Sequence, residues 1–298
     1  INLGVRVMRT PLFKGSTMDL KAEIDMYMHK ASIGEAEMSE EIIERFGERC
    51  KESIRRQFNP EKRDFSIRMS SIGKPLCQQQ MEKAGAERER MKPELKMKFA
   101  YGDLTEALMM AIMEAADIKI EGFQEKVSYK LGKTNIKGTL DVIIDGKVYD
   151  IKSVSKFGFE FKFGHPDGFQ KMVDDDAFGY VSQGYLYGEA KELPFGGWIA
   201  MCKETGKYSV LKTPVNGEPY KRKAIADARK NADSLNRDDP FKRCFEPKMD
   251  TYYKKATGEH CLELTCSYCD FKKACWGDRI EFRKASGKSK SWKWYFND

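Results

Sequence analysis

The sequence predicts a mixed α/β fold of the α+β kind, with a mixed central sheet flanked by helices. Two observations carry this prediction. Apolar residues recur with helical spacing before residue 116 and again over 177–235, whereas the spacing changes to every second residue between 126 and 153. Helical and strand segments therefore follow one another along the chain, as expected where helices pack on a sheet.

Composition favours a packed core with a heavily charged surface. Charged residues make up 33% of the 298 residues, and 53 Lys and Arg against 46 Asp and Glu leave a net charge of +7. No apolar run approaches the roughly 18 residues of a membrane helix, and the N-terminus lacks the pattern of a signal peptide. We therefore expect a soluble, cytoplasmic protein without a membrane partner. The basic excess is a modest indication of a polyanionic partner.

Helix-forming residues dominate the front of the chain. We expect residues 1–65 to form a helical extension, with two charged helices over 18–58 that are separated near 32–34. A further helical block starts after Pro75 and runs towards residue 89. A third helix should cover about 103–116.

Strand patterns follow. Residues 126–131, 136–144 and 147–153 alternate as strands do, and the Gly-, Asp- and Pro-rich stretch 164–176 predicts a loop. Residues 177–190 should be helical. The remaining predictions are a hairpin of 197–202 and 208–213, a charged helix over 218–235, and a cysteine-rich tail. Residues 66–298 would thus form one core that includes the tail.

A short hairpin carries two carboxylates and a lysine. Asp145 and Gly146 form the preferred two-residue turn between β-rich runs, which would place Asp141 opposite Asp150 on one face. Lys152 lies two residues further and points the same way. Opposed like charges need a compensating cation, so this face predicts a site for a hard divalent ion such as Mg²⁺. The alternative is an exposed face on which the lysine merely neutralises an acidic pair.

The pattern Gly-x-x-Asp, a short gap, then Asp-x-Lys resembles the core of the PD-(D/E)xK nuclease superfamily. Asp141, Asp150 and Lys152 fall on its motif positions. The resemblance implies a restriction-endonuclease-like sheet and metal-dependent hydrolysis of DNA. It also implies that the two aspartates and the backbone carbonyl of Ile151 bind Mg²⁺ or Mn²⁺, while the lysine orients the attacking water.

Two further segments sharpen the resemblance to the RecB-like branch. Gln183 and Tyr187 match its Gln-x-x-x-Tyr helix motif and share one helical face, which implies that they position the DNA strand and the lysine. Glu106 lies where this branch places a further ligand, often His. The local alternative for Glu106 is a capping box with Asp103 as the helix N-cap.

Four cysteines form a second candidate site. Cys266, Cys269 and Cys275 make a C-x₂-C-x₅-C triplet, and Cys77 lies 189 residues before Cys266. The set resembles that of RecB-like nucleases with an iron–sulfur cluster, including CRISPR-associated exonucleases and AddB-type nuclease domains. The resemblance implies a structural [4Fe-4S] cluster that ties the helical front to the region 261–278.

The spacing of the cysteines alone is compatible with other interpretations of the tail. Zinc is the alternative metal, with Cys261 or His260 as the fourth ligand. The scattered Cys50, Cys202 and Cys244 read as ordinary cysteines. Basic residues interleaved with aromatics after Lys272 suit single-stranded nucleic acid, or else a tail whose aromatics dock on the core.

The predicted activity is that of a metal-dependent DNA exonuclease that acts from DNA ends or on single-stranded DNA. Alternatives are a structure-specific endonuclease and a catalytically silent, cluster-stabilised DNA-binding adaptor. Recombination or CRISPR proteins would be the partners, and an oligomer is compatible with the sequence. His165, in the loop-like stretch, is a weaker candidate for substrate contact.

Overall fold

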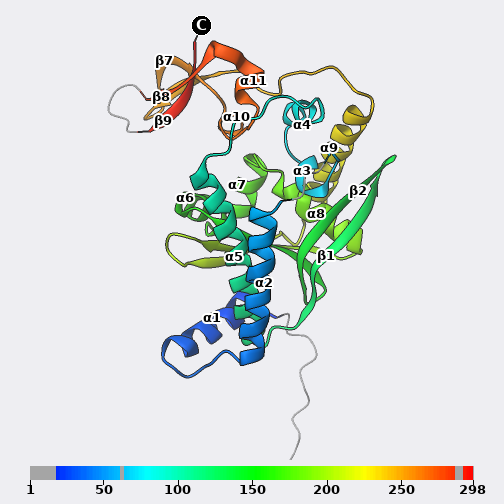
Figure 1. The fold of residues 1–298 in the computed structure, drawn as a ribbon, viewed down its shortest axis with the longest axis vertical. Coiled ribbons are helices and arrows are strands. Elements are labelled where there is room, and N and C mark those ends of the chain that lie inside the picture. Colours follow the sequence, from blue (N-terminus) through cyan, green and yellow to red (C-terminus); the bar gives the residue numbers. More distant parts are fainter. Residues whose placement is uncertain (1–17, 61–63, 286–290, 298) are drawn as a thin grey trace, which may run out of the picture.

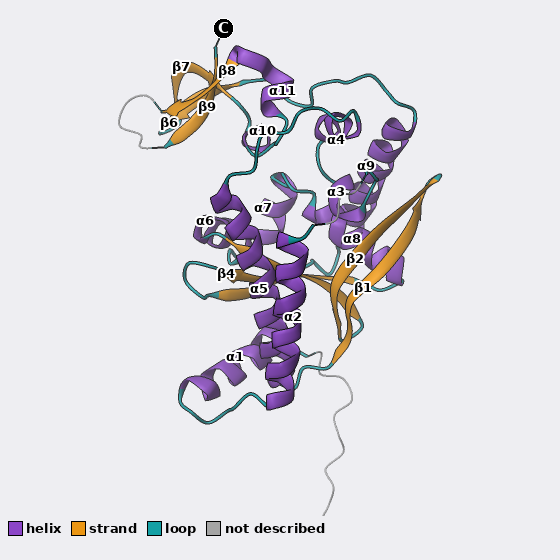
Figure 2. Cartoon of the chain, in the orientation of Figure 1, coloured by secondary structure: helices purple, strands orange, loops and turns teal. Residues whose placement is uncertain are grey.

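The computed structural model describes residues 18–60, 64–285 and 291–297. It has a mixed five-stranded sheet of order β1-β2-β3-β4-β5 and a separate antiparallel sheet of order β6-β7-β9-β8, with helices around the first (Figures 1 and 2). The predicted mixed α/β class is therefore confirmed. Across the described ranges, no helix is both long enough and apolar enough to cross a membrane.

Within the described residues, the two helices predicted over 18–58 form and are part of the core, while residues 1–17 and 61–63 of the predicted extension lie outside the described residues. Helices α1 (Leu20–Ser32) and α2 (Glu40–Phe58) are separated by a short turn. Leu20 and Ile24 are buried in the same apolar cluster as α5. Arg49 on α2 pairs with Glu114 on α5 at 2.5 Å, so α2 is attached to α5, whereas α1 packs on the sheet directly.

The boundaries of the next helices differ from the prediction. The block after Pro75 is α4 (Leu76–Lys83), which ends short of residue 89, and a short helix that was not predicted, α3 (Met69–Ile72), precedes it. Helix α5 (Pro93–Ala115) begins nearly three turns earlier than expected, because Pro93 supplies a favourable first residue. Asp103 is therefore inside the helix, and the predicted N-cap at this residue is wrong.

The central sheet confirms the predicted hairpin. Asp145 and Gly146 both have positive φ, 50° and 63°, as the two-residue turn requires. Ile144 pairs with Lys147, which is the predicted register. Strands β3 and β4 are parallel, and the other neighbours in this sheet are antiparallel. The five strands are β1 (Ile120–Leu131), β2 (Thr134–Ile144), β3 (Lys147–Val154), β4 (Phe195–Cys202) and β5 (Tyr208–Lys212).

The connection from β3 to β4 is helical. It contains α6 (Lys156–Gly158), the π-helix η1 (Phe159–Phe163), α7 (Gly168–Asp174) and α8 (Tyr180–Lys191). The loop predicted over 164–176 is therefore wrong for α7, because local Gly and Asp content outweighed the apolar residues that face the sheet. Because β3 and β4 are parallel, the chain must cross from the end of one strand back to the start of the other, and these helices form that crossover.

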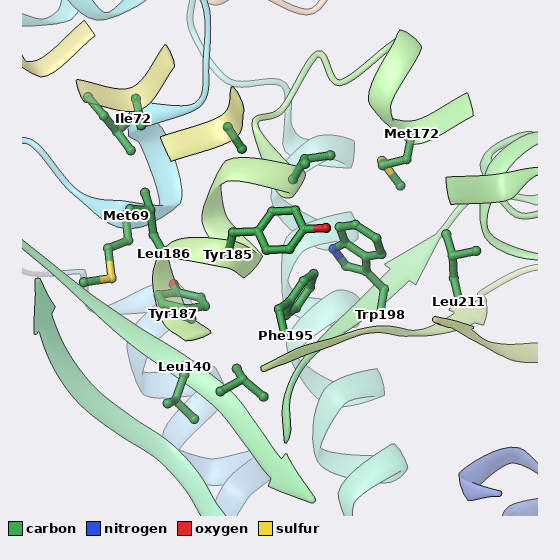
Figure 3. Packing of buried hydrophobic residues seen from close by; sticks show 14 of the residues in the cluster. Met69, Ile72, Leu140, Met172, Tyr185, Leu186, Tyr187, Phe195, Trp198 and Leu211 are labelled. Carbon is green, nitrogen blue, oxygen red and sulfur yellow. The ribbon is translucent and has the colours of Figure 1, made fainter. Parts of the chain in front are cut away.

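The two faces of the sheet are covered by different helices. One face packs on α8 and α9 (Glu218–Asn236), and the other packs on α1 and α5. On the first face, Trp198 is fully buried and its ring meets Phe195 edge-on at 5.0 Å, with Tyr185 beside them (Figure 3). The strands that carry the candidate site are thus held between two apolar layers.

The cysteine-rich tail folds into a small sheet that the sequence did not predict. Its strands are short. Tyr295 of β9 is completely buried and packs in one cluster with Cys261 and Ala285. Figure 1 shows this sheet at the far end of the molecule from α1, with α10 and α11 on the side that faces α4. Its elements are β6 (Lys248–Tyr252), β7 (Lys255–Cys261), α10 (Leu264–Ser267), α11 (Lys272–Trp276), η2 (Gly277–Arg279), β8 (Ile280–Lys284) and β9 (Trp292–Phe296).

Candidate active site and cysteine cluster

The two predicted aspartates lie where β2 and β3 separate. The backbone ladder between these strands ends at the pair Val142 and Tyr149, one pair short of Asp141 and Asp150. Beyond this pair, a side chain replaces the backbone acceptor: Asp141 Oδ2 accepts the main-chain N–H of Ile151 at 2.8 Å. The register prediction therefore holds, while the last pair is bridged by a carboxylate instead of by backbone atoms.

Asp150 is the centre of the site. Its side chain is 1% exposed, and its Oδ1 and Oδ2 lie 2.8 Å and 2.7 Å from Lys152 Nζ. Gln183 Nε2 donates a further, longer hydrogen bond of 3.4 Å to Oδ1. Oδ2 contacts the Lys152 ammonium but receives no well-directed hydrogen bond from a described residue, so the hydrogen-bonding capacity of this buried oxygen is incompletely used.

The helix motif is placed as predicted. Gln183 and Tyr187 lie one turn apart on α8, and Gln183 Nε2 donates to Tyr187 Oη at 3.2 Å. Both residues are buried, and Gln183 links the tyrosine to Asp150. The Tyr187 ring packs on Gly138 of β2, where a Cβ would come within 2.6 Å of Cε1. The glycine of Gly-x-x-Asp is therefore needed for this close approach.

Glu106 is brought towards the same site from α5. Its Oε1 accepts a hydrogen bond from Gln124 Nε2, and its surroundings include Lys152 and Asp150. Burial raises the pKa of Glu106, although Arg56 and Lys152 oppose the shift. No local sequence pattern pointed to Gln124, which lies at a positive φ of 48° within β1.

Charges in this site are strongly coupled. Burial, followed by repulsion from Asp150 and Glu106, raises the pKa of Asp141 well above its ordinary value. Burial alone would lower the pKa of Lys152, but Asp150 and Asp141 outweigh it and raise that pKa. Lys152 also lies 4.9 Å from the centre of the Tyr180 ring, a contact that sequence reasoning missed.

The donor set suits a hard cation, although the ligands are engaged by protein N–H groups. Within the described residues, no three His, Cys, Asp or Glu side chains form a ready metal-binding group. The carboxylates of Glu106, Asp141 and Asp150 nevertheless share one electrostatic environment. Burial, followed by mutual repulsion, raises the pKa values of Glu106 and Asp141. A divalent ion bound by these oxygen donors would relieve that repulsion.

The four predicted cluster cysteines border a single pocket. Cys77 from α4 meets Cys266, Cys269 and Cys275 from the tail, although 189 residues separate Cys77 from Cys266. Burial, then the neighbouring Cys269 and Cys275, raises the pKa of Cys266 to about 12. Grouped, partly buried thiols of this kind suit a thiophilic metal or cluster, which would bind them as thiolates.

A fifth cysteine joins this region, against expectation. Cys244 was predicted to be an ordinary cysteine, but its Sγ accepts the main-chain N–H of Cys77 at 3.2 Å. Cys261, the alternative zinc ligand, lies elsewhere: it is buried with Ala285 and Tyr295 in the small sheet. His260 precedes it on β7, so the pocket favours Cys77 as the distant fourth ligand.

The tail is attached to the helical front by more than cysteines. Lys272 Nζ contacts Glu89, the Glu89 N–H donates to Asp270 O at 2.8 Å, and Arg243 Nη2 donates to Cys275 O at 2.7 Å. Of the tail aromatics, Trp276 is buried whereas Trp292 is 60% exposed. The alternative that the tail aromatics dock on the core therefore holds for Trp276 and not for Trp292. Lys288 and Lys290 lie outside the described residues.

His165 has a local role. Its Nδ1 accepts the N–H of Asp167 at 3.0 Å in the turn before α7. Nearby, the Asp176 carboxylate accepts the N–H groups of Tyr180 and Val181, both at 2.8 Å, and so caps α8.

Comparisons with known proteins do not assign a family. No family model matches the chain, and no curated protein matches it. Among solved structures, a crystal structure of SSO0001 is similar, with a TM-score of 0.41 and 14% identity over 76% of this chain and 94% of that one. A similarity of this extent identifies neither activity nor ligand.

Proposed function

We propose that the chain is a metal-dependent DNA exonuclease. The observation that carries this proposal is the convergence of Asp141, Asp150 and Lys152 where β2 and β3 separate, with Gln183 bonded to Asp150. A structural hairpin would have no need to place a second carboxylate, that of Asp141, beside the buried carboxylate of Asp150. Such groups are typical of sites that bind cations and charged substrates.

Asp141, Asp150, Glu106 and the Ile151 carbonyl would hold one or two Mg²⁺ or Mn²⁺ ions. The chemistry supplied by such ions is polarisation of the scissile phosphate and a lower pKa for the attacking water. Lys152 stays protonated because its pKa is raised, so it can orient water and neutralise charge that develops on the phosphate.

Gln183 and Tyr187 act as positioning residues in this proposal. Gln183 fixes the Asp150 carboxylate through Oδ1, and Tyr187 fixes the Gln183 amide in turn. Burial, then the charge of Asp150, raises the pKa of Tyr187, so its hydroxyl remains neutral and available to a DNA strand.

The cysteine pocket would hold a structural [4Fe-4S] cluster, with zinc as the alternative metal. Cys77, Cys266, Cys269 and Cys275 would be the ligands, because these four border one pocket. The cluster would tie α4 to the tail and take no part in phosphate chemistry.

End-labelled linear DNA tests the activity. The protein with Mn²⁺ should release short labelled products, and EDTA should prevent their release. A closed circular single strand should resist digestion, because an exonuclease needs an end. Cleavage of the circle at the same rate would show an endonuclease, and the absence of metal-dependent cleavage of any DNA would favour the adaptor alternative.

A further inference from the structure

A basic cleft lies between the β1–β2 hairpin and the segment before α3. Its volume is about 1220 Å³, and Arg68, Lys126 and Lys137 border it. None of these three forms an ion pair with a carboxylate in the part of the chain that the structure describes, and no described Asp or Glu borders the cleft. Lys83, which also borders the cleft, differs from these three residues because its ammonium group forms an ion pair with Asp238.

The backbone holds these cations on both walls. Arg68 forms an isolated parallel bridge with Lys137, so the segment before α3 lies against β2. Lys126 pairs with Thr139 across the hairpin, and Ser128 pairs with Lys137, which places all four on one face. In Figure 1 the hairpin extends away from the rest of the sheet beside α3 and α8. The positive charge is therefore built into a rigid pair of strands.

The cleft leads to the candidate active site. Along β2, Lys137, Thr139 and Asp141 occupy alternate positions and so share one face of the strand. Four residues of strand cover about 13 Å. Tyr187 borders the cleft from the opposite face of β2, where its ring packs on Gly138, and it is linked through Gln183 to Asp150. Figure 3 shows Tyr187 between Met69 of α3 and Leu140 of β2.

The rest of the lining combines small polar groups with Phe65, Ile67 and Val127, whose side chains pack against the hydrophobic core. Hydroxyl and amide groups, such as those of Ser70, Thr134 and Asn135, stand beside the three cations. These groups bond phosphate and sugar oxygens and carry no base readout, whereas stacking on bases would need exposed aromatic faces. The lining therefore suits a sugar–phosphate backbone bound without regard to sequence.

We propose that this cleft binds the sugar–phosphate backbone of one DNA strand and guides that strand to Asp141 and Asp150. The inference rests on the proposed function, because that function makes DNA the polyanion. Its chemical basis is separate: three unpaired cations in a cleft without carboxylates, with a strand face that continues into the site.

The test is binding without cleavage. A fluorescein-labelled single-stranded oligonucleotide is titrated in EDTA, with fluorescence anisotropy as the readout, at several salt concentrations. Lys126→Glu/Lys137→Glu should weaken binding at least about tenfold and make the slope of log K against log salt less steep by about 2. The matched control is Lys30→Glu/Lys119→Glu, which makes the same charge change at exposed lysines outside the cleft.

Equal affinity and slope for the cleft variant, the control and the wild type would overturn the proposal. So would equal competition by polyglutamate at the same charge concentration, because the cleft would then be a general anion site. If Lys126→Glu/Lys137→Glu melts at a lower temperature, Lys126→Gln/Lys137→Gln replaces it, with half the charge change and a slope still reduced. Since EDTA prevents turnover, the cleft can fail this test while metal-dependent cleavage stands.

Discussion

The Asp141 carboxylate accepts the main-chain N–H of Ile151 at 2.8 Å, at the point where β2 and β3 stop pairing. This single bond replaces a backbone acceptor with a charged side chain, and it fixes Asp141 beside Asp150. A carboxylate is thereby held in a buried position by the same strand that carries Lys152. The separation of the strands is thus what creates room for a site inside the sheet.

Lys152→Ala should reduce metal-dependent cleavage by at least about a thousandfold, because a buried cation that stabilises developing charge is removed. Oligonucleotide binding in EDTA should stay close to the wild-type value. Cleavage of labelled linear DNA and anisotropy measure the two effects. Lys147→Ala is the control, since Lys147 lies on the same strand near the turn. Full cleavage by the Lys152 variant would remove this residue from the proposed mechanism.

Asp141→Asn should stabilise the metal-free protein at pH 8 and leave its stability unchanged near pH 4. The raised pKa of Asp141 means that folding favours the protonated acid. That contribution is complete below the ordinary carboxyl pKa of about 4 and is lost as pH rises through the folded-state pKa. Asparagine cannot ionise, so the variant avoids the loss and still offers an acceptor to Ile151.

Thermal melts in EDTA across this pH range measure that difference. At pH 8 we expect a rise in Tm of at least about 2 °C, the shift that about 1 kcal/mol gives in a chain of this size class. Asp145→Asn, in the exposed turn of the same hairpin, should give no such pH-dependent difference. A lower Tm for Asp141→Asn at pH 8 would contradict the inferred repulsion.

Gly138→Ala should lower both stability and cleavage. The added Cβ would lie 2.6 Å from Tyr187 Cε1 and 3.1 Å from Met69 Cβ, and neither neighbour can move freely because both are buried. Overpacking of this kind costs about 1–3 kcal/mol. Denaturant unfolding and cleavage rates measure the result. Gly47→Ala, on α2 with nothing within 4 Å of the added Cβ, should be neutral or stabilising.

Cys77→Ser should lose most of the bound iron and release the tail from α4. The reason is that Cys77 is the only cysteine of the proposed four that comes from outside the tail. Iron content, visible absorbance and limited proteolysis of the tail measure the effect. Cys50→Ser, far from the pocket in sequence and on α2, should keep the iron. Wild-type protein purified without oxygen that is colourless, with one zinc and no iron, would replace the cluster by zinc.

Cys244→Ser distinguishes the role of Cys244 from that of Cys77, the two cysteines that contact each other at the pocket. Cys244 Sγ accepts the Cys77 N–H, and a serine oxygen can accept the same bond. We therefore expect the variant to keep its iron, measured as above. Loss of iron in this variant together with its retention in Cys77→Ser would make Cys244 the fourth ligand in place of Cys77.

Local sequence patterns are sufficient to predict the hairpin and the charged residues on it. Asp145 and Gly146 fix the turn and hence the register, because few residues tolerate two successive positive φ angles. The i, i+4 spacing of Gln183 and Tyr187 likewise determined their shared face on α8. Local rules suffice where one turn or one helix sets the geometry.

Contacts between residues that are far apart in the sequence could be identified from the folded chain alone. Local patterns could not show that Gln124 would bond Glu106, that Cys244 would reach Cys77, or that Arg68 would lie beside Lys137. They also placed the start of α5 too late, because they did not account for Pro93 as its first residue. They missed α7 because its Gly and Asp content was weighted above its burial against the sheet. Such contacts depend on how layers pack, and packing free energy is shared among residues far apart in the chain.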